Sequence, residues 1–430
     1  PAASVNWTLD ELYIGRSDYG WGTATGTLRW NQTEAILANA IYLAWGGGTS
    51  ATLDVPTGGT LQLGTAAAPV GFLGIAGNYT GGAKVSADLN FSLTNPTFTA
   101  HIGTELRIGS GSSGDSEGLL NLASNSTLNV GSAAALADIN IGFNAAPNPI
   151  TSVGVLDALN PAASVNWTLD ELYIGRSDHG LGTATGTLLM GNGVSADATT
   201  VTIGSGAGAT GLFDIIGGSL HATTLSLGSG TLDLNANPLT VGSTGTLNAQ
   251  TLDLNGGLLT GQAVSISGGT FNFSGGVLSV DTFTGLLDQN GGVLAPGNSV
   301  GQTTVNGNYD LASAGTVKIE IFGNTFNTTT KLYDRLAVNG TVNLNGDSNA
   351  GGGGTLDVDL GYSPTVGSTF TILANDGTDA VSGRFTGLLE GASFTSAYGS
   401  QTVTFQISYS GGTGNDVVLT VTGKTGAAPT

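Results

Sequence analysis

The chain contains no cysteine, only 11 prolines and one methionine, and few charged residues. Asp, Glu, Lys and Arg make up 9% of its 430 residues, against roughly 25% in an average globular domain. Without cysteine there is no disulfide scaffold, on which small extracellular domains usually depend, whereas a long repetitive domain adds core with every repeat. Intrinsic disorder requires low hydrophobicity together with high charge, and this chain has neither.

Basic residues are scarce as well, since 10 Lys and Arg stand against 30 Asp and Glu, for a net charge of −20. This balance argues against a nucleic-acid partner, because Lys and Arg neutralise phosphates, and against docking on an anionic bilayer. The acidic residues are scattered, which favours solubility through self-repulsion over cation binding. No run of about 18 apolar residues predicts a membrane span. The chain starts at a repeat boundary without Met or a signal peptide, so we expect a trimmed piece of a longer product.

Glycine, by contrast, supplies 72 residues, and part of the chain is duplicated. Residues 1–28 and 161–188 are identical apart from Tyr19/His179 and Trp21/Leu181, at a constant offset of 160. Such cassettes suit an array that adds units end to end. We therefore divide the chain into a first cassette (1–160), a second cassette with the following coils (161–290), and a C-terminal region (291–430).

Short strands of alternating apolar residues, each followed by glycine, recur along the chain as LYIG, LQLG, LRIG, LNVG, VTIG, LSLG and LTVG. This period of two indicates strands with one buried face, and glycine allows the corners between them. From Val201 the spacing is 24, 14, 13 and 12 residues, which predicts a coil of roughly 25 residues and about 17 coils. Residues 33–45, which could pass for a helix, align with a later coil and are predicted as strand. The fold predicted is all-β, a right-handed parallel β-helix (β-solenoid), with a β-sandwich as the structural rival.

From about Gly291 the strands become longer and more aromatic, as expected of a β-rich region that caps the open end of a solenoid. Residues 294–299 (LAPGNS), 305–309 (VNGNY) and 333–340 (YDRLAVNG) resemble the passenger-associated β-strand repeats of bacterial autotransporter proteins. The resemblance is good over about residues 260–423. In residues 1–259 it is limited to the general pattern of short apolar strands followed by glycine. It implies a parallel β-helix displayed outside the cell, with a C-terminal part that helps nucleate folding. The family's translocator barrel does not follow before Thr430, so we expect that it was removed or that export uses another route.

The sequence contains no cluster of acidic residues that would predict an active site. The only adjacent acidic pair of the solenoid, Asp10-Glu11, recurs as Asp170-Glu171, and neighbours on a strand point to opposite faces. Polysaccharide lyases and hydrolases with a β-helix fold need such groups together on one face. The three histidines lie far apart in the sequence. We therefore predict no catalytic residues and no histidine metal site.

Repeated turns and tryptophans in the two cassettes are the best candidates for an interaction surface. Arg and Asp at the corner of each cassette predict either a local ion pair or a docking surface for a sugar or a neighbouring molecule. The tryptophans could pack against a partner or fill the core. The candidate surface consists of Trp7, Arg16, Asp18, Trp21, Trp167, Arg176 and Asp178.

One short motif bears on cofactors. Residues 411–416 (GGTGND) resemble a single calcium-binding GGxGxD repeat, whereas a calcium β-roll needs several in tandem. We expect no cofactor, and Asn415 and Asp416 are the residues at which calcium would bind if it binds at all.

Together these features predict an extracellular structural protein of the bacterial cell surface: a β-solenoid stalk, a sheath or a self-assembling filament subunit. Self-association is expected because open solenoid ends expose unpaired strand edges. One alternative is an adhesin that binds glycans or host surfaces. A β-helix polysaccharide-degrading enzyme is the other.

Overall fold

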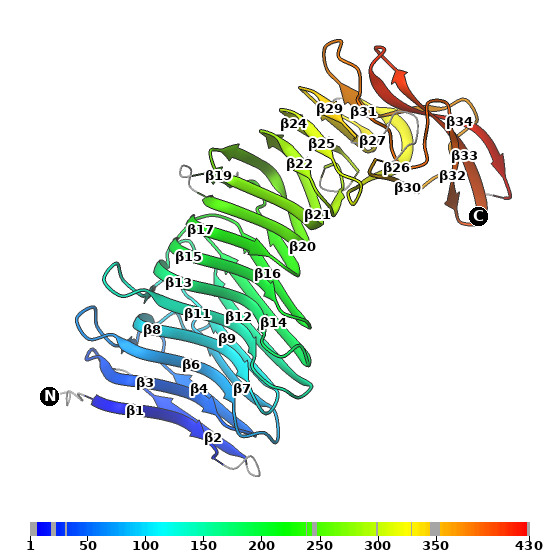
Figure 1. Cartoon of the computed structure of the whole chain (residues 1–430). Coiled ribbons are helices and arrows are strands. Elements are labelled where there is room, and N and C mark those ends of the chain that lie inside the picture. Colours follow the sequence, from blue (N-terminus) through cyan, green and yellow to red (C-terminus); the bar gives the residue numbers. More distant parts are fainter. Residues whose placement is uncertain are drawn as a thin grey trace. The chain divides into compact units, whose positions relative to one another are not determined.

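The structure, a computed structural model, describes residues 7–18, 23–30, 32–237, 239–242, 247–297, 300–327, 329–344 and 353–427. These residues form an all-β chain in which most strands pair in parallel (Figure 1). The chain divides into two compact units, Pro1–Asn235 with Gly245–Gln250 (unit 1) and Ala236–Thr244 with Thr251–Thr430 (unit 2). The division expected at residue 160 falls inside unit 1, and the one expected at residue 290 falls inside unit 2.

Unit 1 is a stack of eight rungs, and Figure 1 shows its strands following one another from β1 to β17. In each rung the chain passes over three faces, which we call C, A and B. Face A holds β1, β3, β6, β8, β11, β13, β15 and β17, the longer of which begin on face C beside β5 and β10. Face B holds β2, β4, β7, β9, β12, β14, β16 and β18. The strands of rungs 1 to 8, in order, are β1 (Trp7–Arg16) and β2 (Ala24–Arg29); β3 (Ile36–Trp45) and β4 (Thr49–Asp54); β5 (Thr60–Leu63), β6 (Val70–Asn78) and β7 (Val85–Asn90); β8 (Thr97–Gly111) and β9 (Ser116–Asn121); β10 (Ser126–Val130), β11 (Ala137–Asn144) and β12 (Ile150–Ala158); β13 (Ser164–Ser177) and β14 (Gly182–Met190); β15 (Val194–Ser205) and β16 (Ala209–Ile215); β17 (Ser219–Leu227) and β18 (Gly230–Asp233).

A column of aliphatic side chains runs through all eight rungs inside face A. Each member pairs with the next through the parallel register, and none is more than 6% exposed. Burying one such side chain contributes about 1.5–3 kcal/mol. The column consists of Ile14, Leu43, Ile75, Ile108, Ile141, Ile174, Ile203 and Leu227.

The steps along this column are 29, 32, 33, 33, 33, 29 and 24 residues long. The coil of roughly 25 residues predicted from the sequence is therefore right only for the last step, and the number of coils predicted from it is too high. The earlier rungs are longer because loops are inserted at their corners. The strand predicted within residues 33–45 is confirmed as β3.

Glycine serves a second column, in which faces A and B touch backbone to backbone. After the inward aliphatic residue of each of rungs 1 to 7, face A has a residue with a left-handed φ between +52° and +74°. Face B places a glycine or alanine opposite it. In every rung where face A has alanine, face B also has alanine. The pairs are Gly15/Gly26, Ala44/Ala51, Ala76/Ala87, Gly109/Gly118, Gly142/Gly154, Gly175/Gly186 and Gly204/Gly211.

Within unit 2 most strands also pair in parallel, and the last ones pair antiparallel. Leu278, Leu294, Val317 and Leu356 form one of its parallel columns. Its strands are β19 (Leu239–Gly242), β20 (Leu247–Ser267, whose first four residues belong to unit 1), β21 (Thr270–Thr284), β22 (Leu287–Gln289), β23 (Val293–Leu294), β24 (Gln302–Asn306), β25 (Tyr309–Leu311), β26 (Thr316–Phe326), β27 (Lys331–Tyr333), β28 (Arg335–Val338), β29 (Val342–Asn343), β30 (Thr355–Leu360), β31 (Thr369–Asn375), β32 (Ser393–Tyr398), β33 (Gln401–Gly411) and β34 (Asp416–Thr425).

The predicted C-terminal cap is present in unit 2. Strand β31 pairs in parallel with β28 on one side and antiparallel with β34 on the other, and β34, β33 and β32 form an antiparallel meander. The last parallel edge is thereby covered, which protects it from pairing with another chain. Among the described residues no helix is long and apolar enough to cross a membrane.

A buried aspartate in one of the segments that carry the family resemblance, residues 333–340, binds the backbone of two other segments of unit 2. Asp334 is 2% exposed. Its Oδ1 accepts a hydrogen bond from the Gly301 N–H at 2.8 Å, and its Oδ2 accepts one from the Glu320 N–H at 2.8 Å. Burial raises the pKa of Asp334 to about 7, although the two hydrogen bonds act in the opposite direction. The motif therefore acts as a structural clamp in unit 2.

Candidate functional site

The outward side chains of face A in rungs 1 to 6 form a continuous row of aromatic rings, guanidinium groups and carboxylates. In rungs 7 and 8 the same positions carry only threonine and serine: Thr200, Thr202, Ser205, Thr224 and Ser226. The change in chemistry is abrupt, so packing of the β-helix alone does not require the aromatic residues. We call this surface the aromatic–arginine strip; it consists of Glu11, Tyr13, Arg16, Tyr42, Trp45, Phe72, Tyr79, Glu105, Arg107, Asp138, Asn140, Phe143, Glu171, Tyr173 and Arg176.

Aromatic side chains predominate in the first three rungs of the strip. Tyr13 and Tyr42 stack with ring centroids 4.5 Å apart and an interplanar angle of 9°. Trp45 stacks on Tyr79 at 4.7 Å and meets Phe72 edge-on at 5.7 Å. The indole of Trp45 can lie close against the sheet because the next rung has glycine beneath it: a Cβ on Gly77 or Gly74 would fall 2.2 or 2.4 Å from the indole Cζ3.

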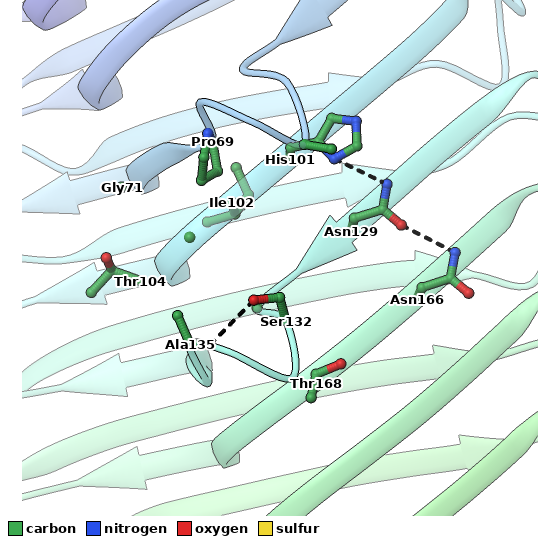
Figure 2. A pocket seen from close by; sticks show the side chains of 13 residues that line it. Pro69, Gly71, His101, Ile102, Thr104, Asn129, Ser132, Ala135, Asn166 and Thr168 are labelled. Atoms are coloured by element: carbon green, nitrogen blue, oxygen red, sulfur yellow. Dashed lines mark hydrogen bonds between the residues drawn. The ribbon is translucent and has the colours of Figure 1, made fainter.

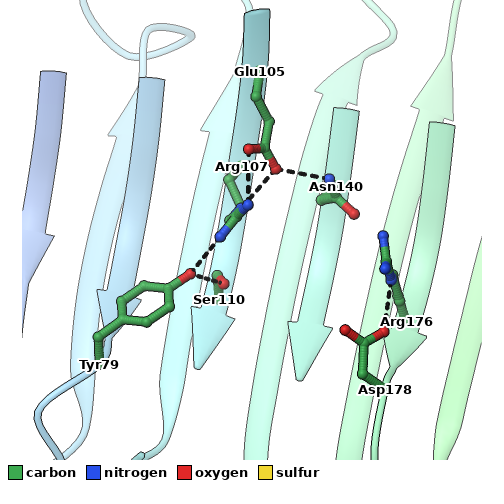
Figure 3. A network of polar contacts seen from close by, with 7 residues as sticks. All are labelled: Tyr79, Glu105, Arg107, Ser110, Asn140, Arg176 and Asp178. Atoms are coloured by element: carbon green, nitrogen blue, oxygen red, sulfur yellow. Dashed lines mark hydrogen bonds and ion pairs between the residues drawn. The ribbon is translucent and has the colours of Figure 1, made fainter. Parts of the chain in front are cut away.

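Arg107 is the centre of the polar network in rungs 3 to 5, which Figure 3 shows. Its guanidinium donates two hydrogen bonds to the Glu105 carboxylate, at 2.7 and 2.8 Å, and one to the Tyr79 hydroxyl at 2.8 Å. Asn140 donates to the same carboxylate at 2.9 Å. The guanidinium also lies 5.2 Å from the ring centroid of Phe143. The charged side chains are therefore bound to one another, which fixes their positions on the surface of the strip.

Three carboxylates stack on successive rungs at the edge of the strip. Glu105 pairs in register with Asp138, and Oδ1 of Asp138 accepts a hydrogen bond from the Glu171 N–H at 3.2 Å. Burial, and the nearby charges of Glu171 and Glu105, raise the pKa of Asp138 above the usual aspartate value. Among the described residues, no three His, Cys, Asp or Glu side chains are grouped in a way that could hold a metal ion.

One expectation about the acidic pairs is wrong. Asp170 and Glu171 both lie outside the core, between Leu169 and Leu172, which are each 1% exposed. The strand bends here from face C to face A, and the bend interrupts the alternation of inward and outward side chains. Two neighbouring carboxylates can therefore share one side of the strand at a corner.

The predicted corner contacts are confirmed in both cassettes. Arg16 Nε lies 2.5 Å from Asp18 Oδ1, and Arg176 Nε lies 2.8 Å from Asp178 Oδ1. Each guanidinium also covers the tyrosine three residues earlier, at 4.1 Å in the first cassette and 4.3 Å in the second. The two cassettes therefore place the same tyrosine–arginine–aspartate group on the strip, five rungs apart.

The tryptophans of the candidate surface have different positions. Trp167 is 1% exposed and belongs to the core, because it follows the inward alternation of Val165 and Leu169. The prediction that Trp167 belongs to an interaction surface is therefore wrong. Trp7 is partly exposed and packs against Trp30 with ring centroids 5.1 Å apart. Trp21 lies outside the described residues.

Asn415 and Asp416, the residues at which calcium would bind, form hydrogen bonds that hold together a turn in unit 2. Oδ1 of Asp416 accepts a hydrogen bond from the Asn375 N–H at 3.0 Å, and Oδ2 accepts one from the Thr413 N–H at 3.1 Å. Asn415 donates to the carbonyl oxygen of Asp379 at 3.1 Å. Both carboxylate oxygens of Asp416 thus accept hydrogen bonds from backbone N–H groups, which stabilise the turn.

The aromatic–arginine strip was not predicted from the sequence, although the sequence contains a signal for it. Aligning LYIG, IYLA, LRIG, INIG and LYIG by their buried aliphatic residues brings Tyr13, Tyr42, Arg107, Asn140 and Tyr173 into one row. Searches with protein-family models and among curated proteins find no match for this chain.

Proposed function

We propose that the chain is an extracellular structural protein of the bacterial cell surface that adheres to neutral polysaccharide through the aromatic–arginine strip. The observation that supports this most strongly is the restriction of the strip to one face of rungs 1 to 6. Large amphipathic rings such as Tyr42 and Trp45 supply much of the binding energy at recognition surfaces, at low entropic cost. Rungs follow one another about every 4.8 Å, so the strip offers a repeating set of contacts to a repeating polymer.

Charge supports a neutral ligand. The three guanidiniums of the strip, on Arg16, Arg107 and Arg176, are each bound to a carboxylate. The net charge of −20 repels polyanions. Sugar C–H faces can stack on the rings, and sugar hydroxyls can bond to Glu105 and Asn140, so neither partner needs an excess of charge.

Binding without cleavage fits the state of the carboxylates better than catalysis does. Glycoside hydrolysis needs two carboxyl groups on either side of the scissile bond, one to donate a proton and one to act as base or nucleophile. Asp138 has the raised pKa of a proton donor, but its carboxylate neighbours are held, Glu105 by two hydrogen bonds from Arg107 and Glu171 by the Tyr173 hydroxyl. We therefore propose adhesion in preference to polysaccharide degradation.

The test compares Trp45→Ala with Thr202→Ala, which changes the strip's row on rung 7, where the strip has ended. Titration calorimetry with soluble glucan, mannan and galactan, and with alginate as the polyanion, measures the affinities. We expect at least one neutral polymer to bind, Trp45→Ala to weaken it about tenfold or more, and Thr202→Ala to leave it unchanged. Equal affinities for the two variants, or preferential binding of alginate, would contradict the proposal.

Self-assembly is a second candidate function, favoured by the duplicated cassette. Among the described residues β1 pairs only with β3, and β2 only with β4, so one edge of each strand has no partner among them. Their copies in the second cassette, β13 and β14, carry further strands on that same edge: β10 and β11 on β13, and β12 on β14. This edge can therefore accept strands without steric conflict. Electron microscopy and sedimentation at high protein concentration test this, and dispersed monomers would count against it.

A further inference from the structure

Two rungs of unit 1 carry the same insertion at the corner between faces C and A. Residues 64–69 (GTAAAP) follow β5, and residues 131–136 (GSAAAL) follow β10. In the first, the Thr65 and Ala68 backbones exchange hydrogen bonds of 2.9 and 3.2 Å; in the second, Ser132 and Ala135 exchange bonds of 2.8 and 3.0 Å. In both, the Thr or Ser hydroxyl also accepts the alanine N–H. We call these insertions the first and second arm.

The rung between the arms has no insertion, because β8 runs through the corner as one strand. The arms are two strand spacings apart, roughly 9.5 Å. They enclose a cleft of about 550 Å³, shown in Figure 2, whose floor is residues 101–104 of β8. Gly103 keeps this floor low, since a Cβ there would come within 3.0 Å of Pro69 Cγ in the first arm. This volume lies within the usual range for small-molecule sites.

The cleft carries no charge. None of its lining residues is Asp, Glu, Lys or Arg, in a chain with 30 acidic residues. Its one titratable side chain is His101, and burial lowers the pKa of this imidazole, which disfavours its charged form. An ionic ligand would find no counter-charge here, whereas the side chains of Thr104 and Thr168 provide hydroxyls and those of Ala66 and Ala135 provide methyl groups.

A ladder of polar side chains on face C gives the cleft directional hydrogen bonding. Asn166 donates to Asn129 Oδ1 at 3.1 Å, and Asn129 donates to His101 Nδ1 at 3.3 Å (Figure 2). With Nδ1 as acceptor, the imidazole proton resides on Nε2. The cleft thus combines an N–H donor, amide and hydroxyl groups, and apolar walls.

The floor of the cleft offers no free strand edge. β8 pairs with β5 and β6 on one side and with β10 and β11 on the other. No edge is left on which a peptide could add as a strand. The lining side chains offer hydroxyl, amide and imidazole groups, which suit a ligand that carries hydroxyls of its own.

We propose that the cleft is a specificity subsite for one or two units of a neutral, unbranched glycan, and this rests on the proposed function. The cleft adjoins the aromatic–arginine strip, because the lining residues Gly71 and Thr104 immediately precede Phe72 and Glu105 of the strip. A sugar chain lying between the arms along β8 continues onto the strip. The arms admit a single unbranched chain and exclude branches, while the strip supplies general affinity.

The test uses Thr104→Trp, which fills the cleft with an indole, and Thr199→Trp as its matched control. Both positions are exposed at a C-to-A corner, but Thr199 lies on rung 7, which has no arms. The probes are neutral cello-, manno- and chito-oligosaccharides of six units, with an oligogalacturonate as the charged contrast. We expect Thr104→Trp to weaken the preferred neutral oligosaccharide about tenfold or more and Thr199→Trp to leave it unchanged.

Histidine NMR provides the second measurement, because the chain has three histidines. The His101 ring resonances should shift saturably with the oligosaccharide, while those of His221, which pairs with Asn248 outside the cleft, should not. If binding depends on Trp45 but His101 does not shift, or Thr104→Trp binds like wild type, the subsite is refuted and the strip survives. If no neutral oligosaccharide binds, the proposed function fails with it.

Discussion

Close contact between faces A and B predicts a large effect from adding a single methyl group. In rung 5 the contact pair is Gly142 and Gly154. A Cβ on Gly142 would lie 2.0 Å from the Thr185 carbonyl oxygen, and φ at Gly142 is +68°. A Cβ on Gly154 would lie 2.2 Å from the Ile108 carbonyl oxygen and 2.3 Å from Gly142 N. Since Cβ contacts below 3.0 Å do not occur, the backbones must separate by nearly 1 Å.

The magnitudes follow from two sources. Left-handed φ costs an alanine about 1–2 kcal/mol, and overpacking costs about 1–3 kcal/mol. Gly142→Ala should therefore destabilise unit 1 by about 2–5 kcal/mol, and Gly154→Ala by about 1–3 kcal/mol. The double variant should cost less than the sum, by about 1 kcal/mol, because one separation of the faces accommodates both methyl groups. In rung 3 the same positions hold Ala76 and Ala87, so Ala76→Gly, which relieves a φ of +59°, should change stability by less than about 1 kcal/mol.

Tryptophan fluorescence in urea is the appropriate assay. All five tryptophans lie between residues 7 and 167, within unit 1, so the signal reports on that unit in the full chain. Gly142→Ala should lower the unfolding midpoint by about 1 M or more. A midpoint for Gly154→Ala no lower than that of Ala76→Gly, or strict additivity in the double variant, would refute the backbone-contact reasoning.

Four further predictions concern three buried polar side chains. Asp334→Ala leaves the N–H groups of Gly301 and Glu320 without an acceptor and should cost about 2–4 kcal/mol in chemical unfolding of the full chain. Because the folded pKa of Asp334 is raised to about 7 from 3.8, the folded state binds its proton more tightly; stability should fall as pH rises from about 4 to 7, and Asp334→Asn should flatten that slope. Trp167→Phe should cost less than about 2 kcal/mol, measured by urea unfolding, because the buried indole N–H has no hydrogen-bond partner. Asn78→Ala should cost about 2–4 kcal/mol in thermal unfolding, because two backbone carbonyls lose their Asn78 donor.

Fold class was predictable because it depends on local alternation. The strands LYIG of the second cassette and LRIG each bury every second residue and end in a glycine corner, as β13 and β8 show. The ion pair of Arg16 with Asp18 was predictable for the same reason, since both residues lie in one turn. The longer, more aromatic strands after about residue 291 likewise predicted a β-rich cap, although not its antiparallel pairing.

Long-range register was not predictable, and the binding features depend on it. Loops at the corners vary the rung length between 24 and 33 residues, so a uniform repeat misaligns the rows from rung to rung. Only the pairing of β6 with β8 brings Arg107 beside Phe72 and Tyr79. The arms follow the same logic: GTAAAP and GSAAAL are visible as a repeat, but the cleft exists only because the rung between them has no insertion.

The most direct test of the in-register parallel stack is a set of spin-label distances. The chain has no cysteine, so labels attach only where cysteine is introduced. On face B the register connects Thr25, Ser86 and Thr210 through successive rungs, with six steps from Thr25 to Thr210 and four from Ser86 to Thr210. At about 4.8 Å per step, electron double resonance should give roughly 29 Å and 19 Å, allowing for label length. Distances that do not grow with the number of rungs would contradict the stacked β-helix and, with it, the strip and the cleft.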